Sequence, residues 1–424
     1  MANEHLCLFC IMRIALTSIL VLLITFSCST SDPSEQGSQK GESSTDNVLN
    51  GTWNGQLLIT DDQSIPFRFQ ITVSQKDTTI TMQNSDERIV MEHHLSGDSL
   101  YLKFPVFDSR LFGTIKDGTF QGKWHNYAKG GDYFVPFTAH LGVSRSDDEK
   151  CNAGFEGKWE TTFSPGKQGE YPALGIFKME GCNVTGTFLT ETGDYRYLWG
   201  SADDDSLTVS CFDGAHAFLF KAAIRDNKLD GMFWSGKHWK EPFVATRNET
   251  YSLRDADSLT FLANNKQIEF ELETPDGYNI AYPSDKTDGN VVILQIMGTW
   301  CPNCMDETEF LRDLHAKYAD QGLNVIAVGF ETSSRDSAMT KLEEYAAHFG
   351  LRYPVVYGGT ASKEAAGKMF PMLNKIISFP TAVFIDRNGT VRKIHTGFAG
   401  PGTGKYYTEF VTSTTEFVEQ LLSE

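Results

Sequence analysis

An internal repeat between residues 48 and 248 sets the strongest limit on how this chain can fold. NGTWNG at Asn50–Gly55 returns in altered form as EGKWET at Glu156–Thr161, and SGDSLYL, FQGKW and VPFTAHL return later in the same order, each after about 106 to 109 residues. A repeat of this length marks two copies of one folding unit. The sequence therefore predicts two related modules, at 48–145 and 152–248.

Short alternating segments predict that both modules consist of antiparallel β structure. FRFQITVS and TITMQ alternate apolar and polar side chains, and Asp-Gly and Gly-Asp turns interrupt them. This period of two is typical of half-buried strands, and such turns join neighbouring strands as hairpins. We expect each module to be a β meander or barrel, with aromatic side chains such as Trp53 and Trp124 in its core.

Cys151, Cys182 and Cys211 belong to the second module or its approach, and no two of them have C-x-x-C spacing. In an exported chain three such thiols predict one structural disulfide and one leftover buried thiol. The spacing does not identify which two cysteines pair.

Residues 1–28 predict an export signal. The apolar run 14–26 is shorter than the roughly 20 residues that cross a bilayer, but its length suits a signal-peptide core, for which Met12 makes a conventional start. The run ends at Ser27 and Cys28, which resembles a bacterial lipoprotein signal and implies lipidation of Cys28. A plain secretory signal or an uncleaved anchor are the alternatives, and each places the protein body outside the cytoplasm. Residues 29–47 contain few apolar side chains and predict a disordered tether.

The pattern changes near residue 264, where strands alternate with helical segments. NVVILQIMG is a continuous apolar strand, and MDETEFLRDLHAKYAD has helical periodicity. An α/β domain is expected over 264–424. Cys301 and Cys304 lie at the predicted corner between that strand and that helix.

Cysteines at a helix N-terminus are suited to redox chemistry. Unpaired backbone N–H groups and the helix dipole favour the thiolate form of Cys301. The offset of three residues places Cys304 one turn further on the same face, where it can resolve a mixed disulfide on Cys301. A zinc site would need two further ligands at suitable spacing, which the sequence does not offer, and a closed structural disulfide in so short a loop would stabilise the fold little. We therefore expect no metal and no cofactor.

The C-terminal motifs resemble the thioredoxin fold, and within it the TlpA/ResA-type thiol-disulfide oxidoreductases. GTWCPNC and FPTAVFIDRNGTV carry this resemblance, which extends over roughly 268–424. It implies that Cys301 attacks, that Cys304 resolves, that the two form a redox disulfide, and that Glu307 handles protons. It also implies a cis peptide bond before Pro380.

The same resemblance implies that Phe379, Pro380 and Thr381 form the substrate-binding edge facing the cysteines, with Trp300 packed over the corner. Ordinary thioredoxin has a buried Asp six residues before the first cysteine, but this chain has Gln295 there. Since an amide cannot act as a base, Glu307 is the better candidate. The alternative for Glu307 is a solvated residue on the helix surface, as we expect for Asp306 and Glu309.

Charge and motif together predict the function. A net charge of −18 excludes a nucleic-acid partner and leaves the lipid anchor as the membrane contact. We expect a periplasm-facing envelope lipoprotein, with the outer surface as an alternative, that reduces disulfides of exported proteins and receives electrons from a membrane donor. Cytochrome c maturation and cell redox homeostasis are the expected processes. The alternatives are a peroxiredoxin-like thiol peroxidase, whose P-x-x-x-T-x-x-C motif does not match, and a surface binding protein with an inactive redox domain.

Overall fold

The computed structural model describes residues 49–74, 77–142, 151, 154–264 and 266–424. The predicted signal peptide 1–28 with Cys28 and the predicted tether 29–47 lie outside these residues. Within the described part, none of the helices combines the length and the apolar character that crossing a membrane requires.

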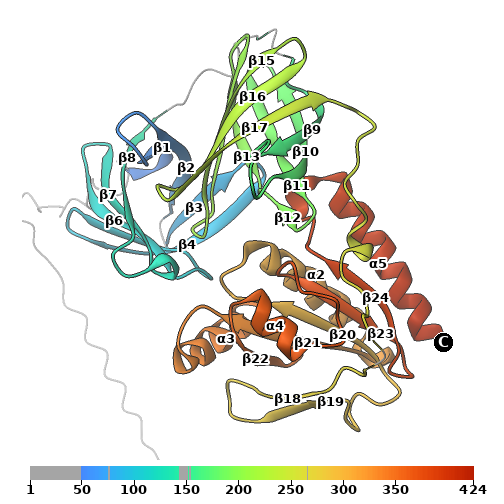
Figure 1. Cartoon of the computed structure of the whole chain (residues 1–424). Coiled ribbons are helices and arrows are strands. Elements are labelled where there is room, and N and C mark those ends of the chain that lie inside the picture. Colours follow the sequence, from blue (N-terminus) through green and yellow to red (C-terminus); the bar gives the residue numbers. More distant parts are fainter. Residues whose placement is uncertain (1–48, 75–76, 143–150, 152–153, 265) are drawn as a thin grey trace, which may run out of the picture. The chain divides into compact units, whose positions relative to one another are not determined.

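The first module is a closed antiparallel barrel in which each strand pairs with the next one along the chain (Figure 1). Pairing of Trp53 in the first strand with Leu141 in the last closes the ring. This order follows from the short turns, because a tight turn can only join antiparallel neighbours. The strands are β1 (Gly51–Leu58), β2 (Ser64–Val73), β3 (Thr78–Asn84), β4 (Glu87–Ser96), β5 (Ser99–Lys103), β6 (Ser109–Lys116), β7 (Thr119–Asn126) and β8 (Phe134–Leu141), with the short helix η1 (Tyr127–Lys129) before β8.

Aromatic side chains fill this barrel. Trp53 and Phe69 lie opposite each other in β1 and β2 and stack with ring centroids 5.8 Å apart. Phe212 of the second module packs edge-on against Phe67 and Trp124, at 5.3 Å and 5.1 Å. All five rings are buried, which confirms that the aromatics of the repeat form core and shows that the two modules pack together.

The second module repeats the closed barrel. The Trp159 indole N–H donates to the Phe155 carbonyl at 2.8 Å, as that of Trp53 does to the Leu49 carbonyl at 3.0 Å. The ring runs β10-β9-β17-β16-β15-β14-β13-β11 and closes by pairing of β10 with β11, while β12 extends it beyond β11. The strands are β9 (Gly157–Phe163), β10 (Tyr171–Glu180), β11 (Asn183–Thr190), β12 (Gly193–Asp194), β13 (Leu198–Ala202), β14 (Ser206–Phe212), β15 (Ala217–Arg225), β16 (Lys228–Ser235) and β17 (Trp239–Arg247).

A disulfide joins Cys151 and Cys182, and Cys211 is a free, buried thiol. The predicted combination of one bridge and one leftover thiol is confirmed, and the structure identifies the pair. The bridge ties the chain just before β9 to the turn between β10 and β11.

The C-terminal domain is built on a mixed five-stranded sheet in the order β22-β21-β20-β23-β24 (Figure 1). β20, β21 and β22 are parallel, whereas β23 and β24 run antiparallel to their neighbours. The strands are β18 (Phe270–Glu273) and β19 (Asn279–Tyr282), which form a separate hairpin, and β20 (Val291–Met297), β21 (Leu323–Glu331), β22 (Val355–Thr360), β23 (Thr381–Ile385) and β24 (Val391–Thr396). The helices are α2 (Pro302–Tyr318), α3 (Arg335–Phe349), α4 (Lys363–Met369) and α5 (Lys405–Ser423), with η2 (Ala256–Ser258), η3 (Ala319–Gln321) and η4 (Pro401–Thr403).

Successive side chains of β20 pack alternately into two different cores, which explains why the sequence of this strand is almost continuously apolar. Val291 and Ile293 pack with α2, α3 and α5, whereas Val292 and Leu294 pack with α4 and the β18–β19 hairpin. A strand covered on both faces needs apolar residues at every position. The predicted fold class, two β modules followed by an α/β thioredoxin-like domain, is confirmed.

Candidate active site

The two cysteines lie where β20 leads into α2, as the sequence predicts. Cys301 is the N-cap residue of α2 and Pro302 is the first helical residue. The Cys301 sulfur accepts a hydrogen bond from the backbone N–H of Cys304, with 3.2 Å between sulfur and nitrogen. An unpaired N–H in the first turn of a helix stabilises negative charge on such a sulfur. The geometry therefore favours Cys301 as the nucleophile.

Accessibility separates the two thiols. Cys301 is 7% exposed and Cys304 is fully buried, and both are free thiols in this structure. Burial raises the pKa of Cys304 well above its ordinary value. Cys301 is therefore the more accessible of the two residues.

The peptide bond between Phe379 and Pro380 is cis, as the resemblance implies. The carbonyl of Phe379 lies 3.4 Å from the sulfur of Cys301, and the rings of Phe379 and Trp300 meet edge-on with centroids 5.7 Å apart. Thr381 opens β23 and donates its hydroxyl to the Ser378 carbonyl at 2.9 Å. The structure thus places Phe379 beside Cys301 and Trp300 beside Phe379, whereas Pro380 and Thr381 are buried.

Gln295 occupies the buried position behind the resolving cysteine. Its side-chain amide donates to the Thr308 hydroxyl at 3.0 Å and to the Cys304 carbonyl at 3.3 Å. The Tyr345 hydroxyl donates to the same Thr308 oxygen at 2.9 Å. Since every member of this network is neutral, Gln295 fixes the first turns of α2 but cannot take a proton from Cys304.

Glu307 is the ionisable group that faces this buried region. It is 1% exposed, so the interpretation as a solvated surface residue is wrong. Among the described residues neither oxygen of its carboxyl group has a partner in hydrogen-bonding geometry, and burial raises its pKa to about 8, which the nearby Gln295 amide opposes. A carboxyl group with such a pKa can exchange protons near neutral pH.

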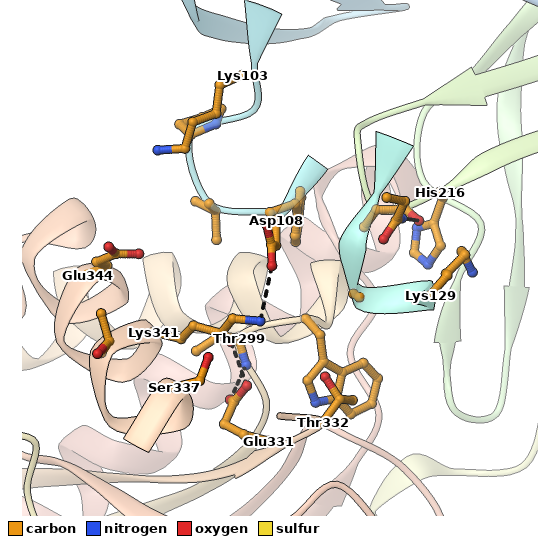
Figure 2. A pocket seen from close by; sticks show the side chains of 18 residues that line it. Lys103, Asp108, Lys129, His216, Thr299, Glu331, Thr332, Ser337, Lys341 and Glu344 are labelled. Carbon is orange, nitrogen blue, oxygen red and sulfur yellow. Dashed lines mark hydrogen bonds and ion pairs between the residues drawn. The ribbon is translucent and has the colours of Figure 1, made fainter. Parts of the chain in front are cut away.

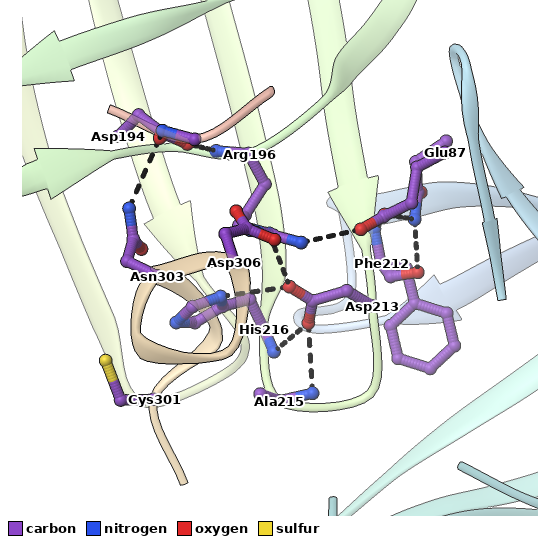
Figure 3. Close-up of polar contacts among 12 residues, drawn as sticks. Glu87, Asp194, Arg196, Phe212, Asp213, Ala215, His216, Cys301, Asn303 and Asp306 are labelled. Carbon is purple, nitrogen blue, oxygen red and sulfur yellow. Dashed lines mark hydrogen bonds and ion pairs between the residues drawn. The ribbon is translucent and has the colours of Figure 1, made fainter. Parts of the chain in front are cut away.

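Asp306 also contradicts the expectation of a solvated side chain (Figure 3). It is buried and forms an ion pair with Arg196 of the second barrel. Arg196 also contacts Glu87 of the first barrel at 2.7 Å and Asp213 at 3.5 Å. Burial raises the pKa of Asp306 to about 8, which the Arg196 guanidinium opposes. The expectation failed because the residues that cover Asp306 come from another module, whereas Glu309 is exposed as expected.

Sequence reasoning missed Glu331, the last residue of β21. Its carboxyl group accepts from both the backbone N–H and the hydroxyl of Thr299, each at 2.8 Å. Glu331 is buried, and burial raises its pKa. A charged residue at the carboxyl end of a buried parallel strand is a signal that could have identified it. Glu331 thus holds in place Thr299 and the segment that leads into Cys301 and Cys304.

A cavity of about 600 Å³ opens beside this segment (Figure 2). Thr299, Trp300 and Glu331 line it from the redox domain, Lys103 and Asp108 from the first barrel, and His216 from the second. An ion pair of 3.4 Å between Lys341 and Asp108 crosses it. Both β modules therefore line a cavity that borders Trp300, the residue before Cys301.

In the described ranges no three Cys, His, Asp or Glu side chains are grouped so that they could hold an ion.

Comparison with known proteins defines the class of the C-terminal domain. Residues 262–408 match the Redoxin family. Together with the five-stranded sheet, the cysteines at the N-terminus of α2 and the cis Pro380, this match makes the domain thioredoxin-like.

Within that class the domain is similar to named thiol-disulfide oxidoreductases. The thiol-disulfide oxidoreductase ResA of Halalkalibacterium halodurans is 28% identical over 154 residues, which cover 36% of this chain and 80% of that protein. ResA of Geobacillus thermodenitrificans is 32% identical over 109 residues, 26% of this chain and 56% of that protein. The thiol:disulfide interchange protein DsbE of Escherichia coli is 28% identical over 134 residues, 31% of this chain and 64% of that protein. The barrels lie outside the Redoxin match.

Proposed function

We propose that this chain is a thiol-disulfide oxidoreductase that reduces disulfides of exported proteins through Cys301 and Cys304. The observation that carries the proposal is the position of the Cys301 sulfur, which lies between the backbone N–H of Cys304 and the carbonyl of Phe379. The first group stabilises the thiolate, and the second marks the backbone edge against which a substrate would align.

The reaction proceeds in two displacements. The Cys301 thiolate attacks one sulfur of a substrate disulfide, that bond breaks, and the other substrate sulfur leaves and takes up a proton. The Cys304 thiol then loses its proton and attacks the Cys301 sulfur, which releases the second substrate thiol. The substrate gains two electrons and two protons, and the enzyme is left with a Cys301–Cys304 disulfide.

Glu307 is the proposed acceptor of the Cys304 proton. Cys304 is buried and its pKa is raised, so its thiol needs a base before it can attack. Glu307 lies one helical turn after Cys304, and its carboxyl group is buried with a pKa raised to about 8. These features support a proton transfer within the closed site.

The proposed substrate edge consists of Trp300, Phe379, Pro380 and Thr381. An extended peptide can pair with the backbone at such an edge, as in strand addition to a sheet. The cavity beside Trp300 offers room for the side chains that flank the substrate disulfide.

The setting of the reaction is proposed from the N-terminal sequence. Lipidation of Cys28 would anchor the protein to the cell envelope, facing the periplasm. Because that compartment is oxidising, a membrane electron donor must return the Cys301–Cys304 disulfide to the dithiol. Maturation of c-type cytochromes, which requires reduced cysteines, and general redox homeostasis are the processes that such a reductant would serve.

Insulin reduction by the full-length chain with dithiothreitol tests the activity. We expect Cys301→Ser to lower the rate at least 100-fold, because the nucleophile is lost. Cys211→Ala is the matched control, since Cys211 is also a buried free thiol but lies in the second barrel. Equal rates for wild type and Cys301→Ser would contradict the proposal and favour the binding-protein alternative.

Trapping tests the substrate class. Cys304→Ala cannot resolve a mixed disulfide, so exported proteins with cysteines should remain attached to Cys301. The same experiment with the Cys301→Ser and Cys304→Ala changes combined should capture none of them. Equal capture by both variants would show that attachment does not involve Cys301.

A further inference from the structure

The second barrel reaches the redox centre through the turn between β11 and β12. The carbonyl of Thr192 accepts a hydrogen bond from the hydroxyl of Ser378 at 2.8 Å, one residue before Phe379. The backbone of Thr192 also lies close to Gly397. A Cβ atom on Gly397 would be only 2.7 Å from the carbonyl carbon of Thr192. This turn therefore packs against the loop that carries the cis proline.

Asp194, at the end of this turn, bonds directly to the motif between the cysteines (Figure 3). One oxygen of its carboxyl group accepts from the side-chain amide of Asn303 at 3.2 Å and from the backbone N–H of Gly400 at 2.7 Å. Its other oxygen accepts from the backbone N–H of Arg196 at 2.7 Å. The same amide also donates to the Phe398 carbonyl of its own domain at 3.1 Å. Asn303 stands between Cys301 and Cys304, so a barrel carboxyl group contacts the C-x-x-C segment itself.

The turn is shaped for this contact. Gly193 has a φ of +149°, and a Cβ atom on it would lie 2.8 Å from the amide nitrogen of Asn303. Two residues beyond Asp194, the Arg196 guanidinium pairs with Asp306, which follows Cys304 on α2. The barrel thus holds α2 both between the cysteines and just after them.

We propose that Asp194 is a positioning residue of the redox centre and that, through Asn303, the second barrel stabilises the dithiol form of Cys301 and Cys304. This inference rests on the proposed function, because it assigns a role in the same dithiol–disulfide couple. The couple depends on the free-energy difference between its two forms, and a disulfide requires its Cβ atoms to lie about 3.5–4.5 Å apart. A contact that holds Asn303 in the arrangement seen with free thiols favours that arrangement over the disulfide.

The test is the equilibrium constant of the full-length chain with reduced and oxidised glutathione. We expect Asp194→Asn to shift it about tenfold toward the Cys301–Cys304 disulfide, which is about 30 mV for a two-electron couple. Glu191→Gln is the matched control, because it removes a carboxylate from the same turn. The Glu191 carboxylate pairs with Arg254, which lies outside the redox domain. This control should stay within twofold of wild type.

A second variant separates shape from charge and guards against misfolding of the first. Gly193→Ala leaves the charge unchanged but pushes against the Asn303 amide, and it should shift the constant in the same direction. Values within twofold of wild type for a folded variant, or a shift toward the dithiol, would overturn the inference. If wild-type protein formed no reversible Cys301–Cys304 disulfide with glutathione at all, the proposed function would fail instead.

Discussion

At the scale of single residues, burial decides how the carboxyl groups of α2 behave. Glu307 and Glu309 are two positions apart on one helix, but the first is buried and the second is exposed. Helical periodicity in the sequence assigns residues to faces, but it does not say which neighbours cover each face. The sequence therefore identified Glu307 as a candidate base and left its surroundings open.

Replacing Glu307 with Gln should remove a pH dependence from the step in which Cys304 attacks the mixed disulfide on Cys301. The Glu307 pKa of about 8 means that roughly a tenth of this group is ionised at pH 7 and half at pH 8. In wild type, release of the second thiol from a mixed disulfide on Cys301 should accelerate through pH 8. In Glu307→Gln we expect this rise to be lost and the rate at pH 8 to fall about 10- to 100-fold. Stopped-flow measurement of thiol release against pH provides the check.

Glu309→Gln is the matched control for this experiment, because it makes the same chemical change on the exposed face of α2. Its profile should coincide with that of wild type. A rise near pH 8 that persists in Glu307→Gln would assign the proton transfer to another group.

At the scale of elements, the repeat and its alternating pattern predicted two antiparallel β modules, each a meander or a barrel, and the structure shows that both are closed barrels. Strand alternation and turn residues are local signals, and the equivalent indole hydrogen bonds of Trp53 and Trp159 show how closely the copies agree. Which cysteines pair is not a local property. Cys151 and Cys182 meet because β9, β10 and β11 fold next to each other.

Removal of the Cys151–Cys182 bridge should destabilise the second barrel. The two residues are 31 positions apart, and a crosslink over such a loop restricts the unfolded chain by about 3–4 kcal/mol. We expect a Cys151→Ser, Cys182→Ser double variant to lower the free energy of unfolding by an amount of this order, as measured by urea denaturation. Wild type under reducing conditions should show the same loss, and an unchanged urea midpoint in the double variant would refute this role.

At the scale of the whole molecule, one buried charge cluster joins all three modules. It consists of Arg196 with Asp194 and Asp213 from the second barrel, Glu87 from the first and Asp306 from α2. Ionising all four carboxyl groups around one guanidinium would cost much free energy, because water is excluded and the negative charges repel one another. Burial accordingly raises the pKa of Asp194, Asp306 and Glu87. The contact between modules should therefore respond to pH.

Stability should fall as pH rises toward 8, and Asp306 should account for part of this fall. Its pKa of about 8 in the folded chain exceeds its ordinary value of 3.8, so the folded state keeps a proton that the unfolded state has lost. For each group of this kind, the free energy of unfolding falls by at most about 1.4 kcal/mol for every unit by which pH rises between these two values. Asp306→Asn, which resembles the protonated acid, should flatten the decline of melting temperature between pH 5 and 8.

Asp313→Asn on the exposed face of α2 is the matched control for this effect. Its melting temperatures should follow the wild-type curve over the same range of pH. Parallel curves for Asp306→Asn and wild type would show that Asp306 does not hold its proton in the folded chain.

The sequence by itself determined the β repeat and the C-x-x-C corner, and its resemblance to a known family implied the cis bond before Pro380, because each of these depends on short motifs that can be read along the chain. Only the tertiary structure decided which groups contact Asp306, Glu331 and Asp194 around the C-x-x-C segment. Their partners lie far away along the chain, and a carboxyl group gains its proton affinity from what covers it. Burial depends on which elements pack against each other, and no local pattern in a strand or helix specifies the element that will cover a given residue.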